Sequence, residues 1–291
     1  MRNKKVKSLP TLVIILVIAL LSYLMTNEES KQVSTITNSG FEVSFIDVGQ
    51  GDSAFIITPE GKTLLIDAGE KDFADDVISH LENKNIEKID VLVATHPHSD
   101  HIGGMEEVVK SFDIGEIYMP KASHTSSAYK GLLETIGEKG YRVKTAKNGV
   151  CINLGNNINA KFLSPFDGEY ENLNNASAVL KITYGDISFL FTGDIEAEAE
   201  KAMCEAGLDL KSTVLKMPHH GSSTSSTKQF VQAVSPQTAV ISLGKDNEYG
   251  HPHSQIVERY EAQGVKIYRT DKSGTITIRT DGKQFAVEEE K

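Results

Sequence analysis

The sequence predicts an α/β domain in which two mixed sheets pack face to face and helices cover their outer faces, an αββα arrangement. From residue 41 to about residue 287, short β-rich runs alternate with polar, helix-like segments. The chain of 291 residues is 39% hydrophobic and 24% charged, which is typical of globular proteins and excludes collagen-like, disordered and polytopic membrane classes. Residues 41–291 contain no repeat and no internal boundary, so we expect one domain there.

The N-terminal segment, residues 1–26, differs from the rest in composition. Four basic residues within the first seven positions precede an uncharged, apolar stretch of about 17 residues, near the lower limit for spanning a bilayer. This pattern predicts a signal-anchor helix with a cytoplasmic N-terminus, a polar linker over 27–40, and a single-pass cell-membrane protein whose catalytic domain lies outside the cytoplasm. A cleaved signal peptide, which would give a secreted domain, is the alternative, although residues 21–28 lack a small-residue cleavage site.

The first part of the body reads as three strands, at 41–47, 53–58 and 62–67, joined by glycine-containing turns as an antiparallel meander. Apolar residues at helical spacing predict a helix over 73–83, and 89–95 reads as a buried strand. The remaining expected strands are 114–119, 142–145, 160–163, 179–184, 187–192, 214–217, 238–243, 266–269 and 275–279, and the remaining expected helices are 126–139, 196–206, 227–234 and 254–263.

Directly after the buried strand 89–95, three histidines and a carboxylate fall within six residues: His96, His98, Asp100 and His101. Imidazoles and carboxylates bind zinc and manganese, and a turn at the end of a strand aims several of them at one point. His96 and His98 share a face if the segment is extended, whereas Asp100 and His101 on the following turn could reach a second metal.

Three later strand ends also carry candidate site residues. Gly193 allows a tight turn that projects the Asp194 carboxylate, which is also a favourable helix N-cap residue. His219 and His220 follow the strand 214–217; if the segment stays extended they point to opposite faces, so that one binds metal and the other orients substrate or donates a proton. His251, after the strand 238–243, is a further candidate for a catalytic role.

The HxHxDH pattern formed by His96, His98, Asp100 and His101 resembles the fingerprint of the metallo-β-lactamase superfamily, and further runs resemble the hydrolase domain of the ComEC competence proteins. The resemblance covers nearly all of residues 41–287. It implies a four-layer αββα metallo-β-lactamase-like sandwich and an exported hydrolase that acts as a nuclease, without extending to the DNA-translocating channel. The matching runs are 47–53 (DVGQGDS), 65–69 (LIDAG), 191–194 (FTGD), 218–222 (PHHGS) and 249–252 (YGHP).

The resemblance also implies roles for individual residues. Asp194 occupies the place of a carboxylate that bridges two metal ions, and His251 lies where the last ligand is often found. A further histidine that completes the first metal site in many members is missing from 167–192, where Asn174 and Asn175 stand instead. Amides are weak ligands, so one or two divalent ions are expected, with manganese or another hard ion favoured over zinc at the first position.

Two carboxylates and one amide are expected to support the site. Asp67 follows an apolar strand and is expected to orient a ligand histidine from outside the metal sphere. Asp52 either contacts substrate or sets the turn before the second strand, and Asn175 lies beside the metal site or the substrate. The metal-ligand candidates are His96, His98, Asp100, His101, Asp194, His219 and His220, and the catalytic candidates are Asp100, His219, His220 and His251.

Together these observations predict a metal-dependent hydrolase, most simply a phosphodiesterase or nuclease that uses a metal-activated hydroxide. Its expected partners are a phosphodiester substrate such as DNA or RNA and, through the N-terminal helix, a membrane; no protein partner can be inferred. The alternative is hydrolysis of a non-phosphate ester, thioester or lactone at the same site. The net charge of −10 would repel the phosphates of a nucleic acid, so binding of a polynucleotide requires a local basic groove. Candidates for it are Lys121, Lys130, Lys216, Lys228, Lys245 and Arg269.

Overall fold

The computed structural model of the chain describes residue 18 and residues 40–291. The membrane segment predicted at 1–26 and the linker at 27–40 therefore lie, apart from residues 18 and 40, outside the described residues, and both stay predictions. Within the part of the chain that is described, no helix combines the length and the apolar character needed to cross a membrane.

The first sheet has eight strands and joins the two ends of the domain. Its order is β15-β14-β1-β2-β3-β4-β5-β6. β1, β2 and β3 pair antiparallel, as the meander prediction required, and β3 to β6 are parallel. The strands are β1 (Phe41–Phe45), β2 (Ala54–Ile57), β3 (Thr63–Ile66), β4 (Lys88–Val93), β5 (Asp113–Met119), β6 (Val143–Thr145), β14 (Ile276–Thr280) and β15 (Phe285–Glu289).

The second sheet has seven strands in the order β13-β12-β11-β10-β9-β8-β7. β7 to β10 pair antiparallel, and β10 to β13 are parallel. The strands are β7 (Cys151–Ile152), β8 (Ile158–Ser164), β9 (Val179–Tyr184), β10 (Ile187–Phe191), β11 (Val214–Lys216), β12 (Thr238–Ile241) and β13 (Lys266–Arg269).

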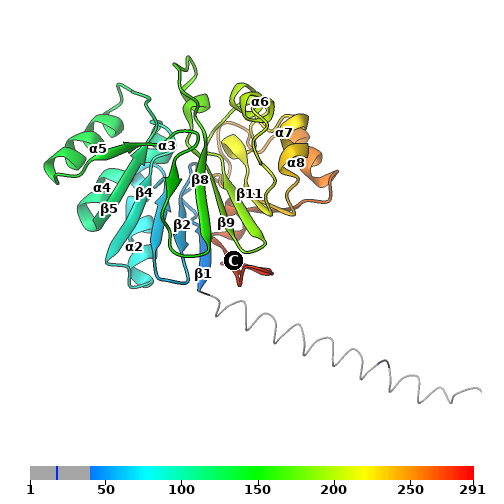
Figure 1. Cartoon of the computed structure of the whole chain (residues 1–291), viewed down its shortest axis with the longest axis horizontal. Helices are drawn as coiled ribbons and strands as arrows, with labels where there is room; N and C mark the ends of the chain where they lie inside the picture. The colour runs from blue at the N-terminus through cyan, green and yellow to red at the C-terminus, as the bar shows by residue number, and fades with distance from the viewer. Residues whose placement is uncertain (1–17, 19–39) are drawn as a thin grey trace, which may run out of the picture.

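Helices cover the outer face of each sheet, which gives the four-layer sandwich expected from the sequence (Figure 1). α2, α4 and α5 lie on one side, and α6, α7 and α8 lie on the other. The α-helices are α2 (Ala74–Asn83), α3 (Ser99–Ile102), α4 (Met105–Ser111), α5 (Ser127–Glu138), α6 (Ala197–Glu205), α7 (Lys228–Val234), α8 (Ser254–Glu261) and α9 (Thr270–Ser273). The 3-10 helices are η1 (Lys71–Phe73), η2 (Leu173–Ala176) and η3 (Pro218–Gly221).

Three apolar clusters hold the layers together. One lies between the sheets and is rich in aromatic rings, such as Phe45 stacked on Phe191 with centroids 5.9 Å apart. The other two lie between each sheet and its helices. In α2, for example, Ala74, Val77 and Leu81 are buried at helical spacing, which explains why this segment forms an amphipathic helix against the sheet.

The α-helices and strands that were not predicted are the short β7, α3 and α9, together with α4 and the last strand, β15. Met105, Val108 and Val109 of α4 are buried at helical spacing, but the helix has only seven residues and follows the polar run at 96–104. β15 (FAVEE) is an edge strand with three half-buried residues followed by two exposed ones, so it carries neither the alternation nor the long apolar run that marks a strand.

The loops that carry the candidate residues gather at one edge of the sandwich. Parallel pairing of β3 with β4, and of β10 with β11 and β12, places the carboxyl ends of these strands at a common edge within each sheet.

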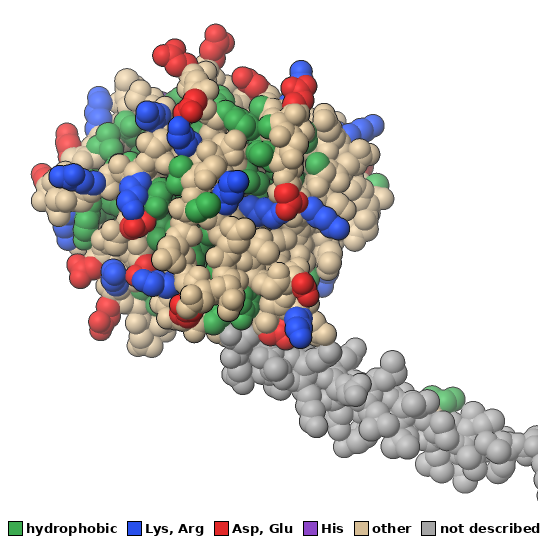
Figure 2. All heavy atoms as spheres, viewed as in Figure 1, with side chains coloured by type: hydrophobic (Ala, Val, Ile, Leu, Met, Phe, Trp, Pro, Cys, Tyr) green, Lys and Arg blue, Asp and Glu red, His purple; other side chains and the backbone are tan. Residues whose placement is uncertain are grey.

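Acidic and basic side chains are interspersed over the molecular face in Figure 2, so the negative net charge is not concentrated on that face.

The loop before β2 approaches the turn of α3 so closely that position 51 has no room for a side chain. A Cβ atom on Gly51 would lie 2.3 Å from the backbone oxygen of Asp100. The 47–53 loop and the histidine-rich loop are therefore packed backbone against backbone, which fixes Asp52 next to Asp100.

We predict that Gly51→Ala lowers the free energy of unfolding by about 1–3 kcal/mol, because one of the two loops must move. It should also weaken metal binding. Gly137→Ala is the matched control: its Cβ meets nothing within 4 Å in α5, so it should be neutral or stabilise by about 1 kcal/mol. Urea unfolding of both variants checks this, and equal stabilities would contradict it.

Candidate metal centre

The centre of the site is formed by four side chains from three loops, one loop of the first sheet and two of the second. Asp100 and His101 lie on the turn after β4, Asp194 follows β10, and His220 follows β11. His101 Nε2 lies 3.2 Å from Asp194 Oδ2 and 3.6 Å from Asp100 Oδ2. His220 Nε2 lies 3.4 Å from each of the same two oxygens. Donor atoms of all four residues lie within 4.8 Å of one another, so they could hold one cation.

The hydrogen bonding of these groups fits a cation. His101 Nε2, His220 Nε2 and Asp194 Oδ1 are buried, and within residues 40–291 none of these atoms has a hydrogen-bond partner. Unpaired buried polar atoms are costly, and here they face one another across the space where a metal would bind. Nitrogen and carboxylate oxygen donors suit zinc, manganese and iron.

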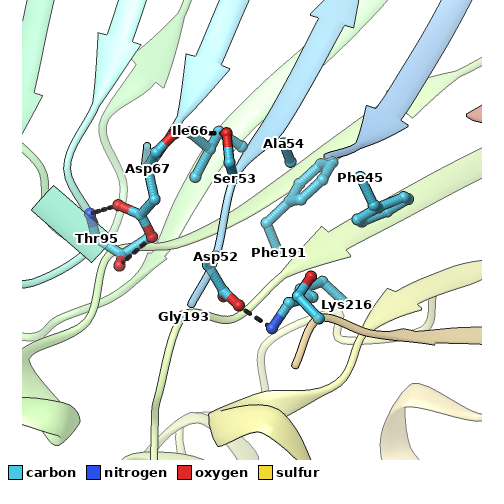
Figure 3. Close-up of a pocket in the computed structure, with 11 residues that line it drawn as sticks. Phe45, Asp52, Ser53, Ala54, Ile66, Asp67, Thr95, Phe191, Gly193 and Lys216 are labelled. Atoms are coloured by element: carbon cyan, nitrogen blue, oxygen red, sulfur yellow. Dashed lines mark hydrogen bonds and ion pairs between the residues drawn. The ribbon is translucent and has the colours of Figure 1, made fainter. Parts of the chain in front are cut away.

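Asp67 holds His101 in the orientation that a ligand needs. It follows β3 with a left-handed backbone (φ 59°), and its Oδ2 accepts a hydrogen bond from His101 Nδ1 at 2.8 Å. Its other oxygen accepts from the backbone N–H of Thr95 at 2.8 Å, as Figure 3 shows. Because an ionised carboxylate only accepts, Nδ1 of His101 donates to Asp67, and Nε2 is the nitrogen that a metal would bind in place of a proton.

The hydroxyl of Thr95 sets the tautomer of a second histidine. It donates its single hydrogen to Asp67 Oδ2 at 2.6 Å, so toward His96 Nδ1, 3.1 Å away, it acts as acceptor. His96 Nε2 therefore has the free lone pair, and it lies 3.0 Å from His98 Nδ1. The structure thus brings His96 and His98 together, as predicted. The analysis of the sequence gave Thr95 no role, although it directly follows the buried strand.

His219 and His220 do not lie in an extended segment, so the condition under which the sequence predicted opposite faces is not met. Both have left-handed φ angles, 48° for His219 and 53° for His220, within η3. Such residues are uncommon outside glycine and often mark functional sites. His220 is buried and its Nδ1 lies 2.8 Å from the carbonyl oxygen of Ser242, an acceptor, so Nε2 is the free nitrogen. Both rings approach Asp194, with His219 Nε2 3.8 Å from Asp194 Oδ2.

Asp52 and Lys216 form a buried ion pair below the cluster. Lys216 Nζ lies 2.7 Å from Asp52 Oδ2, and their side chains are only 4% and 8% exposed. Figure 3 shows this pair beside the Asp67–Thr95 contacts. Asp52 Oδ1 also lies 3.4 Å from His220 Nδ1. Asp52 is therefore buried beneath the metal-ligand candidates and is not placed to contact substrate. Lys216 is buried as well, so the prediction that it contributes to a basic groove is wrong.

Asn175 does not face the site, contrary to the expectation from the sequence. Its Oδ1 accepts hydrogen bonds from the backbone N–H groups of Glu196 and Ala199, where it caps the start of α6. The neighbouring Asn174 contributes to the wall of the pocket instead. The sequence could not separate the two because adjacent amides in a short 3-10 turn differ only in direction.

A pocket of about 330 Å³ opens above the cluster. Besides the predicted His219 and His251, its walls include His124, which stands in no sequence motif, and the aromatic ring of Tyr249. His124 lies edge-on to His98 with centroids 5.7 Å apart. The lining residues are Gln50, His98, Ser99, Asp100, His124, Ser126, Asn174, Asp194, His219, His220, Tyr249 and His251.

The buried histidines and carboxylates of the site strongly shift one another's pKa values. Burial alone would lower the pKa of His220, but the nearby carboxylates of Asp194, Asp52 and Asp100 raise it to about 10. The pKa of His101 is raised well above its usual value by Asp194, Asp100 and Asp67 against the effect of burial. Burial opposes ionisation of Asp194, yet His101 and His220 hold its pKa well below the usual range. In the metal-free protein, therefore, two protonated imidazoles balance the carboxylates, and a divalent cation would replace these protons.

Comparison with known proteins identifies the family of this chain. The family model described as Metallo-beta-lactamase superfamily matches residues 46–245. ComE operon protein 3 of Bacillus subtilis is 32% identical over 255 residues, covering 82% of this chain and 33% of that protein. Competence protein ComA of Neisseria gonorrhoeae is 32% identical over 236 residues, covering 80% and 31%. The chain spans about a third of the length of these relatives.

Solved structures share the fold at low sequence identity. CmlA, a diiron beta-hydroxylase from Streptomyces venezuelae, superposes with a TM-score of 0.56 at 17% identity, covering 82% of this chain and 54% of that one. The metallo-beta-lactamase fold protein YhfI from Bacillus subtilis gives a TM-score of 0.50 at 14% identity, covering 79% and 96%. These similarities extend to the architecture of the sandwich.

We predict that Asp67→Asn weakens metal binding about 10- to 100-fold, because the amide no longer fixes the proton of His101 on Nδ1. Titration calorimetry with Zn²⁺ and Mn²⁺ measures the change in Kd. Asp209→Asn, an exposed carboxylate paired with Lys181, is the control and should bind as the unmodified chain does. An Asp67→Asn variant with unchanged Kd for both ions would show that Asp67 serves only the fold.

We also predict that the metal-free protein loses stability as pH rises from about 6.5 to 10. The pKa of His220 is about 10 in the folded chain and about 6.5 when unfolded, so its stabilising charge is fully present below pH 6.5 and disappears as pH passes 10. Thermal unfolding in EDTA across this range measures the effect. His220→Asn should show a shallower fall in Tm, and a slope equal to that of the unmodified chain would contradict the assignment.

Proposed function

Because the chain belongs to the metallo-β-lactamase superfamily, we propose that this metal-dependent hydrolase is a phosphodiesterase that acts on nucleic acid. The observation that carries the proposal is the group of buried, unpaired donors on His101, His220 and Asp194. His220 and Asp194 also line a pocket large enough for a phosphate and its neighbours. The names of relatives, which include competence proteins and the Recombination protein 2 of Haemophilus influenzae, support nucleic acid as the substrate.

One or two divalent ions, when bound, would activate water and offset negative charge on a phosphate. His101, His220, Asp100 and Asp194 would hold one ion, with His96 and His98 as the nitrogen donors of a second position next to it. Asp194 Oδ2 lies 3.2 Å from His101 Nε2 and 3.4 Å from His220 Nε2, and it would be the carboxylate shared by both positions. The nitrogen and carboxylate donors fit zinc, manganese and iron, so the identity of the ion must be measured.

His219 is the residue best placed to protonate the leaving oxygen. It lines the pocket, and its Nδ1 lies 3.4 Å from Glu196 Oε1 and 3.2 Å from the hydroxyl of Thr224. These contacts orient the imidazole toward the pocket, as proton transfer from a positioned side chain requires. His220 has its Nδ1 committed to a backbone carbonyl and is the metal ligand of the pair.

The other catalytic candidates take supporting roles. Burial, together with the nearby His220 and His219, lowers the pKa of His251 to about 4, so its ring is neutral at pH 7 and serves as a hydrogen-bonding wall. Asp100 lies at the pocket floor, and His101 and His220 hold its pKa below the usual range although burial opposes this. It therefore stays ionised as a ligand and as an acceptor for a proton of the attacking water.

Hydrolysis of a non-phosphate ester, thioester or lactone is the second candidate, and one observation favours it. Within the described part of the chain, no lysine or arginine lines the pocket. Arg269, proposed for a basic groove, is paired with Asp271 at 2.7 Å, and Lys216 is buried. A long polyanion would thus gain little from the pocket walls, so the phosphodiesterase proposal requires recognition of only a short part of the strand.

We predict that the full-length chain with Mn²⁺ or Zn²⁺ cleaves single-stranded DNA, and that His98→Ala and Asp100→Ala each reduce the rate about 100-fold or more. Asp167→Ala, which removes an exposed carboxylate paired with Lys147, is the matched control and should retain full activity. EDTA should abolish cleavage.

The proposal fails if the metal-loaded chain hydrolyses ester, thioester or lactone substrates while leaving single- and double-stranded DNA, RNA and bis-p-nitrophenyl phosphate intact. Turnover of bis-p-nitrophenyl phosphate without turnover of any polynucleotide would restrict the substrate to a small phosphodiester.

A further inference from the structure

Three aromatic rings form a ladder from the metal centre to the rim of the pocket. The rings of His220 and His251 are nearly parallel, with centroids 6.2 Å apart and planes inclined by 25°. The rings of His251 and Tyr249 continue the series at 5.6 Å and 21°. The inner end of the ladder is a candidate metal ligand, and the outer end is the phenol ring of Tyr249.

The outer ring is exposed to a degree that folding does not explain. Tyr249 has a relative exposure of 66%, the highest among the large exposed hydrophobic side chains of the described residues. Aromatic rings gain stability mainly by burial, so a ring held in solvent beside a pocket is a candidate for contact with a ligand.

The loop that carries Tyr249 is held in place by side-chain hydrogen bonds. Asn247 Nδ2 donates to the carbonyl oxygens of Gly244 and His251 at 3.0 and 2.8 Å, and Asn247 Oδ1 accepts from the backbone N–H of His251 at 2.9 Å. Gln50 Oε1 accepts from the backbone N–H of Gly244 at 3.1 Å, which joins the loop to the opposite wall. Tyr249 is therefore positioned before a ligand arrives, and less entropy is lost on binding.

The pocket offers few other ways to hold a nucleotide. Its described walls carry no lysine or arginine, so the phosphate must be neutralised mainly by metal ions, and the rest of the ligand must find contacts that are not ionic. Planar nucleobases stack on exposed aromatic rings whatever their identity, because every base has a π-face. A flat ring at the rim, two stacking steps from the metal centre, meets this requirement.

We propose that Tyr249 is the stacking platform for the nucleobase that adjoins the phosphate bound at the metal centre. This rests on the proposed phosphodiesterase function and narrows it to nucleosidic substrates whose base is unpaired, such as single strands and frayed ends. A base inside a duplex is already stacked on both faces, so it must leave the helix to reach the ring. Recognition by stacking tolerates any base sequence.

The first experiment uses the fact that the chain contains no tryptophan. Tyr249→Trp introduces a single fluorophore at the platform, and Val143→Trp introduces one at an exposed site in the edge strand β6, on the residue that begins the strand. Each variant is loaded with Zn²⁺ and titrated with a phosphorothioate-linked thymidine tetranucleotide and with the same chain lacking its bases.

We expect the tetranucleotide to quench the fluorescence of Tyr249→Trp, whereas the abasic chain does not, and neither ligand should quench Val143→Trp. Equal quenching by both chains, or binding detected by calorimetry without quenching, would overturn the stacking assignment.

The second experiment measures kcat/KM with cleavable oligonucleotides that carry or lack bases. Tyr249→Ala should reduce the preference for the base-containing chain about 5- to 150-fold, mainly through KM, and Tyr249→Phe should preserve it. Val143→Ala should leave both activity and preference unchanged. If the unmodified chain cleaves neither oligonucleotide, the phosphodiesterase function and the platform fall together. If it cleaves both with a preference that Tyr249→Ala does not alter, only the platform falls.

Discussion

The site depends on one constraint: each buried imidazole at the metal centre must present a specific nitrogen. Asp67 accepts from His101 Nδ1, and the carbonyl oxygen of Ser242 accepts from His220 Nδ1, so in both rings Nε2 faces the carboxylates. The Thr95 hydroxyl connects the same carboxylate to His96. These acceptors lie on different strand ends, so the two sheets must pack in one relative position for all three rings to converge.

Much of this arrangement was predictable because it follows from strand topology. The alternation of β-rich and helical segments gave the layers, and the parallel pairing of β3 with β4 and of β10 with β11 brings Asp67, His101 and Asp194 to the loops at one edge. The HxHxDH spacing predicted a metal site after β4, because few other roles require three histidines and a carboxylate within six residues. Two of these residues, Asp100 and His101, belong to the group of donor atoms that the structure brings together.

What the sequence did not reveal depends on backbone geometry and on long-range pairing. The left-handed angles of His219 and His220 leave no periodic pattern, so the sequence could not show in which direction each ring points. Lys216 was taken for a solvent-facing cation because its ion-pair partner, Asp52, lies far away in the chain. Asn175 was assigned to the site because a capping interaction with the backbone of α6 looks the same in sequence as a ligand position.

The division of the centre between the two sheets also has a consequence for the order of folding. Asp100 and His101 come from the first half of the chain, and Asp194 and His220 come from the second. Neither half alone supplies more than two of the four donors, and contacts between distant segments form late because loop closure costs entropy. Tight binding of an ion would therefore require that both halves have docked, so a cation would stabilise the folded sandwich and would not nucleate its assembly.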